Sequence, residues 1–247
     1  MKLIIPTFNR SAKLQRTLEC YFDGDYHKQY IVVIDGSNEE HETVNRKICE
    51  KMGFEYIHYN PNLDFNERLH LYLTTKCKSE LVCLGTDEDV FCSTYIKDSE
   101  KFLSKNNDYS SYIGRYITVG KPLFGLKRFV YARDHITSLD LKYEDPARRL
   151  LSLMNVIMVG CSPLHWCAKR RSQLIKTLES QIALNINYGS THEMMNQVYL
   201  SLNGKIKFVK KPMLLRDETN IGYKPSKDRY IPNISETLLD FEKLKNK

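Results

Sequence analysis

Four short strand-like runs, each followed by polar residues, constrain the fold more than any other feature of this sequence. The four runs occupy residues 3–5, 30–34, 54–59 and 81–84. Residues 54–59 alternate between apolar and polar, and the other three runs are almost continuously apolar. Stretches with helical spacing lie between them, at residues 11–22, 39–52 and 65–75. Continuously apolar strands are typical of parallel sheets buried on both faces. The alternation therefore predicts an α/β, Rossmann-like fold, in which a mostly parallel central sheet carries helices on both faces.

Polar clusters follow three of these predicted strands, at residues 7–10, 35–38 and 86–89. Ligands of such sheets bind beyond the carboxyl ends of the strands, so we expect a site where these clusters meet. Asp87 and Asp89 are two residues apart and point to the same side of an extended chain. Two carboxylates beside a phosphate-bearing ligand suit Mg²⁺ or Mn²⁺. The alternative is a solvated acidic turn, the usual setting of charged residues.

The second half of the chain has a less regular pattern. Strands are expected at residues 112–119, 129–131, 156–159 and 206–209, and helices at 95–103, 169–178, 193–202 and 235–244. No Gly/Ser-rich linker separates the halves, so we expect one domain with an appended, smaller lobe.

Charge is divided unevenly along the chain. Residues 1–120 carry 15 basic and 18 acidic residues, a net charge of −3, whereas residues 121–247 carry 22 and 12, a net charge of +10. The asymmetry suggests two surfaces with different partners. No apolar run approaches a membrane span, and Pro6 ends the first run too early for a secretory signal. Seven scattered cysteines without a CxxC pair are typical of reduced thiols, so a cytoplasmic protein is expected.

Three segments resemble the GT-A glycosyltransferases, especially glycosyltransferase family 2. Ile4-Ile5-Pro6-Thr7-Phe8-Asn9-Arg10 is similar to the first-strand signature of that family. Ile31-Val32-Val33-Ile34-Asp35-Gly36-Ser37-Asn38 is similar to its second, and Thr86-Asp87-Glu88-Asp89 stands where the family has its DxD motif. The resemblance covers about the first 100 residues well and the rest loosely.

The resemblance implies a nucleotide-sugar donor and a role for each matching residue. For the first two loops, it implies that Pro6, Thr7 and Asn9 border the nucleotide, that Arg10 touches the pyrophosphate and that Asp35 contacts the base or ribose. It also implies that Arg68 lies near the donor. For the third loop, it implies that Asp87 holds ribose or sugar hydroxyls and that Asp89 ligates Mn²⁺ or Mg²⁺. Two alternatives stay open from the residues themselves. Asp35 would equally form an Asx-turn, and Arg68 would pair with Glu67 or Asp64 on the surface.

Later in the chain the resemblance points to a catalytic base. Family members carry an acidic pair at the start of a helix, where this sequence has His192-Glu193. Glu193 is thereby implied to deprotonate the acceptor hydroxyl. The alternative is a capping box formed by Ser190 and Glu193.

Three further clusters remain open. Packing is favoured over zinc for Cys161, His165 and Cys167. Trp166 either stacks on an acceptor sugar or fills the lobe. Arg216-Asp217-Glu218 either closes the donor site or forms a surface ion-pair patch.

The expected function is metal-dependent transfer of a sugar, with inversion, from a UDP-sugar or similar donor to a hydroxyl acceptor. Residues 1–247 would form a single GT-A domain: residues 1–110 the nucleotide-sugar-binding half, residues 111–247 the acceptor-binding half and a C-terminal extension. The acceptor is expected to be a glycan, a lipid-linked molecule or another hydroxyl compound, and to be anionic in keeping with the basic half. Modified nucleic acid is a minor alternative. We also expect the protein to contact the inner face of a membrane peripherally. The competing functions are a non-catalytic nucleotide-sugar-binding module and a nucleotidyltransferase. The absence of glycine from residues 5–10 counts against the second.

Overall fold

The fold was analysed in a computed structural model of residues 1–247, which describes residues 1–24, 26, 28–120, 129–133, 141–157, 163–186 and 189–217. Four sequence predictions lie outside these residues: the helix at 235–244, the last two residues of the strand at 156–159, the role of Cys161 and the role of Glu218.

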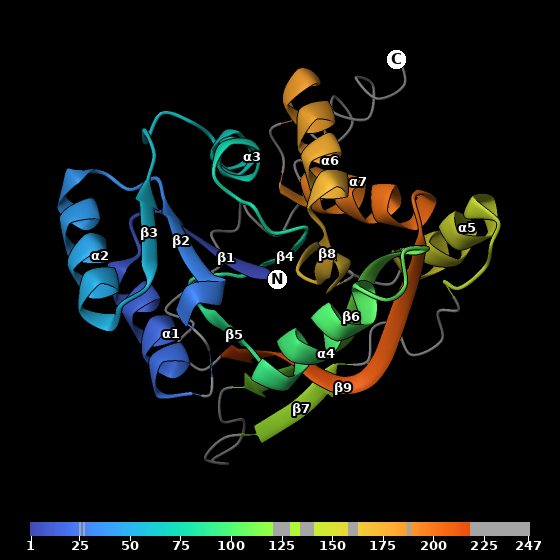
Figure 1. The fold of residues 1–247 in the computed structure, drawn as a ribbon, viewed down its shortest axis with the longest axis horizontal. Helices are drawn as coiled ribbons and strands as arrows, with labels where there is room; N and C mark the ends of the chain where they lie inside the picture. Colours follow the sequence, from blue (N-terminus) through green and yellow to red (C-terminus); the bar gives the residue numbers. More distant parts are fainter. Residues whose placement is uncertain are drawn as a thin grey trace.

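A parallel sheet forms the first half of the fold. Its strands lie in the order β3 (Glu55–His58), β2 (Ile31–Asp35), β1 (Lys2–Thr7) and β4 (Leu81–Leu84), and all three of their pairings are parallel. The connecting helices are α1 (Ser11–Asp23), α2 (Glu39–Met52) and α3 (Phe65–Thr75). Every strand and helix predicted for this half is confirmed, α2, α3 and β4 with their predicted bounds (Figure 1).

Local end signals explain why α2 and α3 begin and end where they do. The Asn38 side chain accepts a hydrogen bond from the His41 backbone N–H, and Gly53 ends α2 with a positive φ of 75°. Asp64 and Glu67 form a capping box at the start of α3. These contacts satisfy backbone groups that a helix end would otherwise leave without partners.

The second half extends the same sheet with mixed strand directions. Its strands are β8 (Ala168–Arg170), β6 (Tyr109–Gly120), β9 (Lys205–Asp217) and β5 (Asp89–Phe91), with β7 (Phe129–Arg133) on β6. β8 is antiparallel to both β4 and β6, whereas β9 runs parallel to β6 and antiparallel to β5. The predicted α/β class is confirmed: the sheet is parallel over its first four strands and mixed beyond them.

The helices of this half are α4 (Ser93–Leu103), α5 (Pro146–Ile157), α6 (Arg171–Ala183) and α7 (Gly189–Leu202), and short 3₁₀ turns occupy Lys28–Tyr30 and Pro163–His165. The strand predicted at residues 156–159 is wrong for residues 156 and 157, which end α5. A short apolar run does not distinguish a strand from a helix end, and α5 buries Leu153 completely. The helix predicted from residue 169 begins at Arg171, because residues 168–170 pair with β4 and β6.

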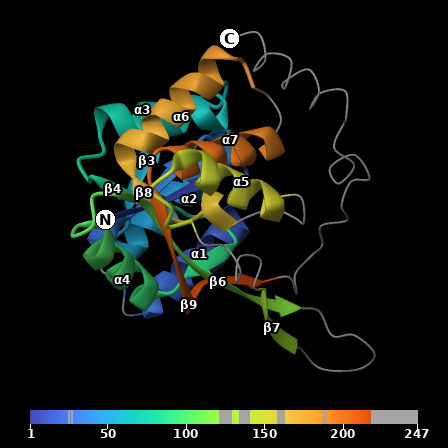
Figure 2. The same cartoon turned by 90° about the vertical axis from the view of Figure 1, so that its right-hand side faces the viewer.

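Both faces of the sheet are covered by helices, as the apolar strands predict. Alternate residues of β1 and β2 point to opposite faces. Leu3 and Val33 join a buried cluster with α1, α2 and α4, whereas Ile4 joins a second cluster with α3 and α6. Both views show α3 and α6 together on one side and α1 and α4 on the other (Figures 1 and 2). None of the described helices is long and apolar enough to cross a membrane.

Tyr95 of α4 joins the strands where the sheet changes direction. Its hydroxyl donates to the Tyr112 carbonyl of β6 (2.6 Å) and accepts from the Ala168 N–H of β8 (2.8 Å). The side chain is 1% exposed, so water cannot replace either bond. This one hydroxyl therefore completes the backbone hydrogen bonding at the junction.

We predict that Tyr95→Phe lowers the free energy of unfolding by about 1–3 kcal/mol, because it leaves a buried carbonyl and a buried N–H without this partner. Urea denaturation followed by circular dichroism measures the change. Tyr143→Phe, at a ring that is 38% exposed, is the matched control. Equal stability of the two variants would show that the hydroxyl contributes nothing to the junction.

Candidate active site at the carboxyl ends of the strands

Three polar loops meet at the carboxyl ends of β1, β2 and β4. Thr7 at the end of β1 pairs with Asp35 at the end of β2, and the Gly36 N–H donates to the Thr7 carbonyl (3.2 Å). After β4, the Gly85 N–H donates to the Ile4 carbonyl (2.7 Å). The structure thus brings together the three clusters that the sequence predicted to converge.

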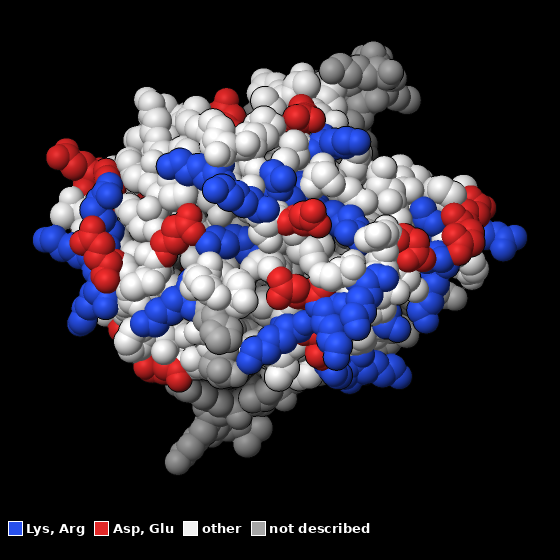
Figure 3. Space-filling model, viewed as in Figure 1, with Lys and Arg blue, Asp and Glu red and all other residues white. Residues whose placement is uncertain are grey.

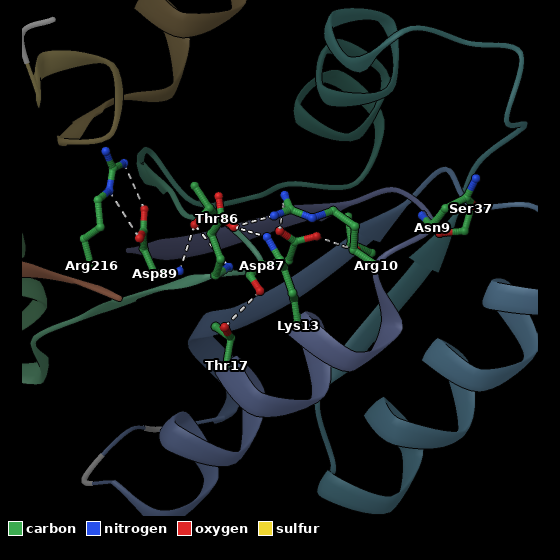
Figure 4. A network of polar contacts seen from close by, with 11 residues as sticks. Asn9, Arg10, Lys13, Thr17, Ser37, Thr86, Asp87, Asp89 and Arg216 are labelled. Atoms are coloured by element: carbon green, nitrogen blue, oxygen red, sulfur yellow. Dashed lines mark hydrogen bonds and ion pairs between the residues drawn. The ribbon is translucent and has the colours of Figure 1, made fainter. Parts of the chain in front are cut away.

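Asn9 connects the first loop to the second. Its N–H donates to the Ser37 hydroxyl (2.8 Å), and its side-chain oxygen accepts from the Asn38 N–H (3.0 Å). Asn9 makes these bonds with a left-handed backbone, at a φ of 54°. Asparagine tolerates that conformation better than most residues. Asn9 therefore shapes the loop (Figure 4), and its predicted contact with the nucleotide stays a prediction, as does that of Pro6.

Asp35 lies completely buried beneath the second loop. Its carboxylate accepts from the Ser37 N–H (2.7 Å), from Asn45 Nδ2 (2.8 Å) and from the Tyr56 hydroxyl (2.7 Å). The bond to Ser37 is the Asx-type contact that the sequence left open as an alternative. Asp35 fixes the shape of the loop in this structure, and its contact with a base or ribose remains a prediction.

Arg68 lies against the same loop. Its guanidinium donates to the Leu63 carbonyl (2.6 Å), and an added Cβ at Gly36 would approach Nη1 to 2.2 Å. Its Cζ is 5.5 Å from the ring centroid of Phe8, which is 47% exposed. Burial lowers the pKa of Arg68. Arg68 thus lies beside the β2 loop. Asp64 and Glu67 cap α3, and their charges still oppose the fall in the Arg68 pKa, so the contact of Arg68 with a donor stays a prediction.

Asp87 is held by residues of the first loop and of α1. Its side chain is 3% exposed, accepts from the Thr7 hydroxyl (2.9 Å) and pairs with Arg10 (2.8 Å). The Thr17 hydroxyl donates to the Asp87 carbonyl (3.0 Å). Burial raises the pKa of Asp87 to about 6, against the opposing effects of Arg10 and Thr7. Thr7, Arg10 and Asp87 thus form one polar unit, in which Figure 4 shows Arg10 directed toward Asp87.

The carboxylates of Glu88 and Asp89 form ion pairs with different basic side chains. Glu88 pairs with Arg10 and with Lys13 of α1. Asp89, which is 2% exposed, pairs with Arg216 of β9: Oδ2 lies 3.1 Å from Nη2 and Oδ1 3.4 Å from Nε. Burial raises the pKa of Asp89, and the charge of Arg216 opposes that rise. Each carboxylate of the acidic cluster is therefore neutralised by a named basic side chain.

Glu193 of α7 belongs to the same electrostatic environment. Burial raises its pKa, and Arg216, the partner of Asp89, opposes that rise. α7 is described from Gly189 onward, and the alternative of a capping box formed by Ser190 and Glu193 stays open. Arg216 thus pairs with the predicted metal ligand and contributes to the electrostatic environment of the predicted base.

The remaining candidates are packed residues. The Cys167 thiol donates to the Leu164 carbonyl (3.0 Å), and the His165 ring meets Trp166 edge-on at 4.5 Å between centroids. Trp166 packs against both apolar clusters, in keeping with its lobe-filling alternative.

Sequence reasoning missed several residues that shape the site. Lys13 lies one helical turn after Arg10, and this spacing in the sequence indicates that the two side chains lie on the same face of the helix. Asn45 and Tyr56, the donors to Asp35, had no local signal, because their contacts depend on how α2 and β3 pack.

The residues present fit a divalent cation. Mg²⁺ and Mn²⁺ bind carboxylate oxygens, keep several waters and are completed by substrate phosphates, so one or two protein carboxylates suffice. Both Asp89 oxygens already interact with a cation, the Arg216 guanidinium. No group of three or more His, Cys, Asp or Glu suited to a metal occurs among the described residues, so the site would depend on ligands from the substrate.

The sequence model described as Glycosyl transferase family 2 matches residues 2–129, more than half of the chain. The chain belongs to glycosyl transferase family 2. The match contains all three loops of the site and confirms the predicted family, and with it the glycosyltransferase class. No curated protein matches the sequence.

Solved structures confirm the GT-A fold of this family 2 member. Residues 1–349 of S. aureus TarS in complex with UDP-GlcNAc align with a TM-score of 0.52 and 17% identity, covering 88% of this chain and 58% of that one. The mannosyltransferase PcManGT from Pyrobaculum calidifontis, in complex with GDP-Man and Mn²⁺, aligns with a TM-score of 0.58 and 12% identity, covering 100% and 64%. The chain covers 37% of a longer TarS structure at 14% identity and a TM-score of 0.52. It therefore spans less than two thirds of each of these proteins.

We predict that Asn9→Ala is less stable than Asn9→Gly by about 1 kcal/mol. Both variants lose the side-chain bond to Asn38, but only alanine is strained at a φ of 54°. Thermal and urea unfolding of the two variants measure the difference. If alanine were as stable as glycine, the left-handed backbone at residue 9 would not be a constraint on the loop.

Proposed function

We propose that this family 2 member transfers a sugar from a nucleotide-sugar donor to a hydroxyl acceptor, with a divalent cation and inversion at the anomeric carbon. The observation that carries the proposal is the position of Arg216. This residue pairs with Asp89, the proposed metal ligand, and acts on the pKa of Glu193, the proposed base. The three functions that the proposed reaction needs, which are donor binding, charge stabilisation and proton removal, would then be carried out by neighbouring residues.

The donor would bind across the first two loops. Phe8 and Arg68 offer an exposed ring and a guanidinium beside the β2 loop, which suits a nucleobase. Arg10 and Lys13 offer cations suited to a diphosphate. Asp87 would hold ribose or sugar hydroxyls. The complexes of TarS with UDP-GlcNAc and of PcManGT with GDP-Man support a nucleotide sugar, and we propose a UDP-sugar.

Asp89 would hold Mn²⁺ or Mg²⁺, and such an ion supplies Lewis-acid stabilisation of the leaving nucleoside diphosphate. Glu193 accepts the proton of the acceptor hydroxyl as its oxygen bonds to the anomeric carbon. The bond from that carbon to the diphosphate oxygen breaks, and its electron pair leaves with the nucleoside diphosphate. Attack from the opposite face gives inversion. Burial raises the pKa of Glu193 and makes its carboxylate a stronger base.

The acceptor would carry its hydroxyl on a glycan, a lipid-linked molecule or another anionic compound. Lys and Arg side chains gather over β9 and α4 on one face of the molecule (Figure 3). The lysines of β9 are Lys205, Lys207, Lys210 and Lys211. We further propose a cytoplasmic protein that contacts a membrane surface from its inner side, in keeping with the free cysteines of the described chain.

We predict that Glu193→Gln lowers kcat by about 10²- to 10⁴-fold with little change in donor affinity, because it removes the proton acceptor alone. Asp89→Ala should instead weaken donor binding in the presence of Mn²⁺. Turnover of a panel of nucleotide sugars and calorimetric donor binding separate the two effects. Glu50→Gln, an exposed carboxylate on α2, is the control.

Two results would contradict this proposal in different ways. If an active wild type keeps its kcat after Glu193→Gln, the base is another residue. If no nucleotide sugar binds, the enzyme proposal fails. Binding without turnover would favour the competing non-catalytic module.

The pH dependence of kcat gives a second test. A base must be deprotonated to act, so activity is lost as pH falls through its pKa. Burial raises that pKa above the ordinary 4.5, so we predict an acid limb above pH 4.5. The measurement is kcat against pH at saturating donor and acceptor. Persistence of the same limb in the residual activity of Glu193→Gln would assign it to another group.

A further inference from the structure

Backbone pairing fixes Arg216 opposite Asp89. β5 and β9 are antiparallel, and Asp89 and Arg216 are direct partners in their register. One guanidinium reaches both oxygens of the carboxylate, at 3.1 and 3.4 Å (Figure 4). Arg216 is therefore built into the sheet as the counter-ion of Asp89.

A divalent cation at Asp89 would compete with this guanidinium. The Asp89 side chain is 3% exposed, so water screens little of the repulsion between two cations on it. Conversely, an ionised carboxylate at this depth needs a cation beside it. The site consequently favours one cation at a time.

Arg216 also lies against an aromatic ring while it is paired with Asp89. Its Cζ is 5.4 Å from the ring centroid of Tyr116, within the range of a cation–π contact. The buried Tyr116 hydroxyl has no hydrogen-bond partner among the described residues. Burial raises the pKa of Tyr116 and of Glu193, and the charge of Arg216 opposes both rises. The side chain itself is 33% exposed, which leaves it room to move.

We infer that Arg216 is an exchangeable counter-ion, which holds Asp89 ionised in the donor-free protein and gives it up when a divalent cation binds. The released guanidinium keeps its place against the Tyr116 ring and turns toward water on its exposed side. Arg216 thus acts through Asp89 and opposes metal binding in the absence of donor; it is a positioning residue and has no catalytic role of its own. The inference rests on the proposed metal at Asp89, and it adds a residue that sets the affinity for that metal.

The test is titration of the full chain with MnCl₂ alone, without donor, followed by the electron paramagnetic resonance signal of free Mn²⁺. Arg216→Gln should bind Mn²⁺ at least about tenfold more tightly than wild type, because the competing cation is gone. Arg216→Lys keeps a cation but loses the fork that reaches both oxygens, so its affinity should lie between the two. Lys211→Gln removes an exposed cation from the same strand, one paired with Asp98, and should match wild type.

The possible failures are distinguishable. If Arg216→Gln binds Mn²⁺ no more tightly than wild type, the inference is overturned while the metal proposal stands. If no folded variant binds Mn²⁺, with or without UDP, both are overturned. Should Arg216→Gln fail to fold by circular dichroism, Arg216→Lys decides the matter: affinity equal to wild type overturns the inference.

Discussion

The candidate site depends on the pairing of a three-residue strand with the last strand of the described chain. β5 (Asp89–Phe91) pairs with the end of β9, and the Cys92 N–H adds a bond to the Met213 carbonyl (2.8 Å). This pairing brings residue 216 to residue 89 and ties the acidic loop of the first half to the second half. β9 also runs along β6, so the same strand carries that loop into the mixed part of the sheet. β5 therefore links the acidic loop directly to the strand that packs against α7.

Charge is buried at the site in two different ways, and the difference separates permanent from exchangeable contacts. Asp35 is satisfied by neutral donors, two of them side chains of α2 and β3, and none can leave without disturbing the packing. Asp87 and Asp89 are satisfied mainly by guanidinium groups whose side chains are 38% and 33% exposed. Partly exposed cations can be replaced by the charges of a ligand at modest cost. This favours a structural role for Asp35 and a ligand-binding role for the acidic loop.

The sequence predicts this structure where the signals are local. The ends of α2 and α3 were predictable because Asn38, Gly53 and the Asp64–Glu67 box act within a few residues. The acidic loop was placed correctly because it follows a buried strand. β5 and β8 were not predictable, since each has three residues and exists only through its partners. The same reason hides the donors to Asp35 and the link from Arg216 to Asp89, which cross between distant segments.

The structure also changes the meaning of the uneven charge. Part of the positive excess in residues 121–247 is internal: Lys169 is completely buried on backbone carbonyls, and Arg149 donates to the carbonyls of Ser201 and Leu202 at the end of α7. Arg216 neutralises a carboxylate of the other half. These charges support the fold and the candidate site, so they say nothing about an acceptor.

On β9, Lys205 and Lys211 already have acidic partners, whereas no ion pair within the described chain engages Lys207 or Lys210. The charge on β9 that is available to an anionic acceptor is therefore that of the partly exposed Lys207 and the exposed Lys210, which is far less than the net charge of +10.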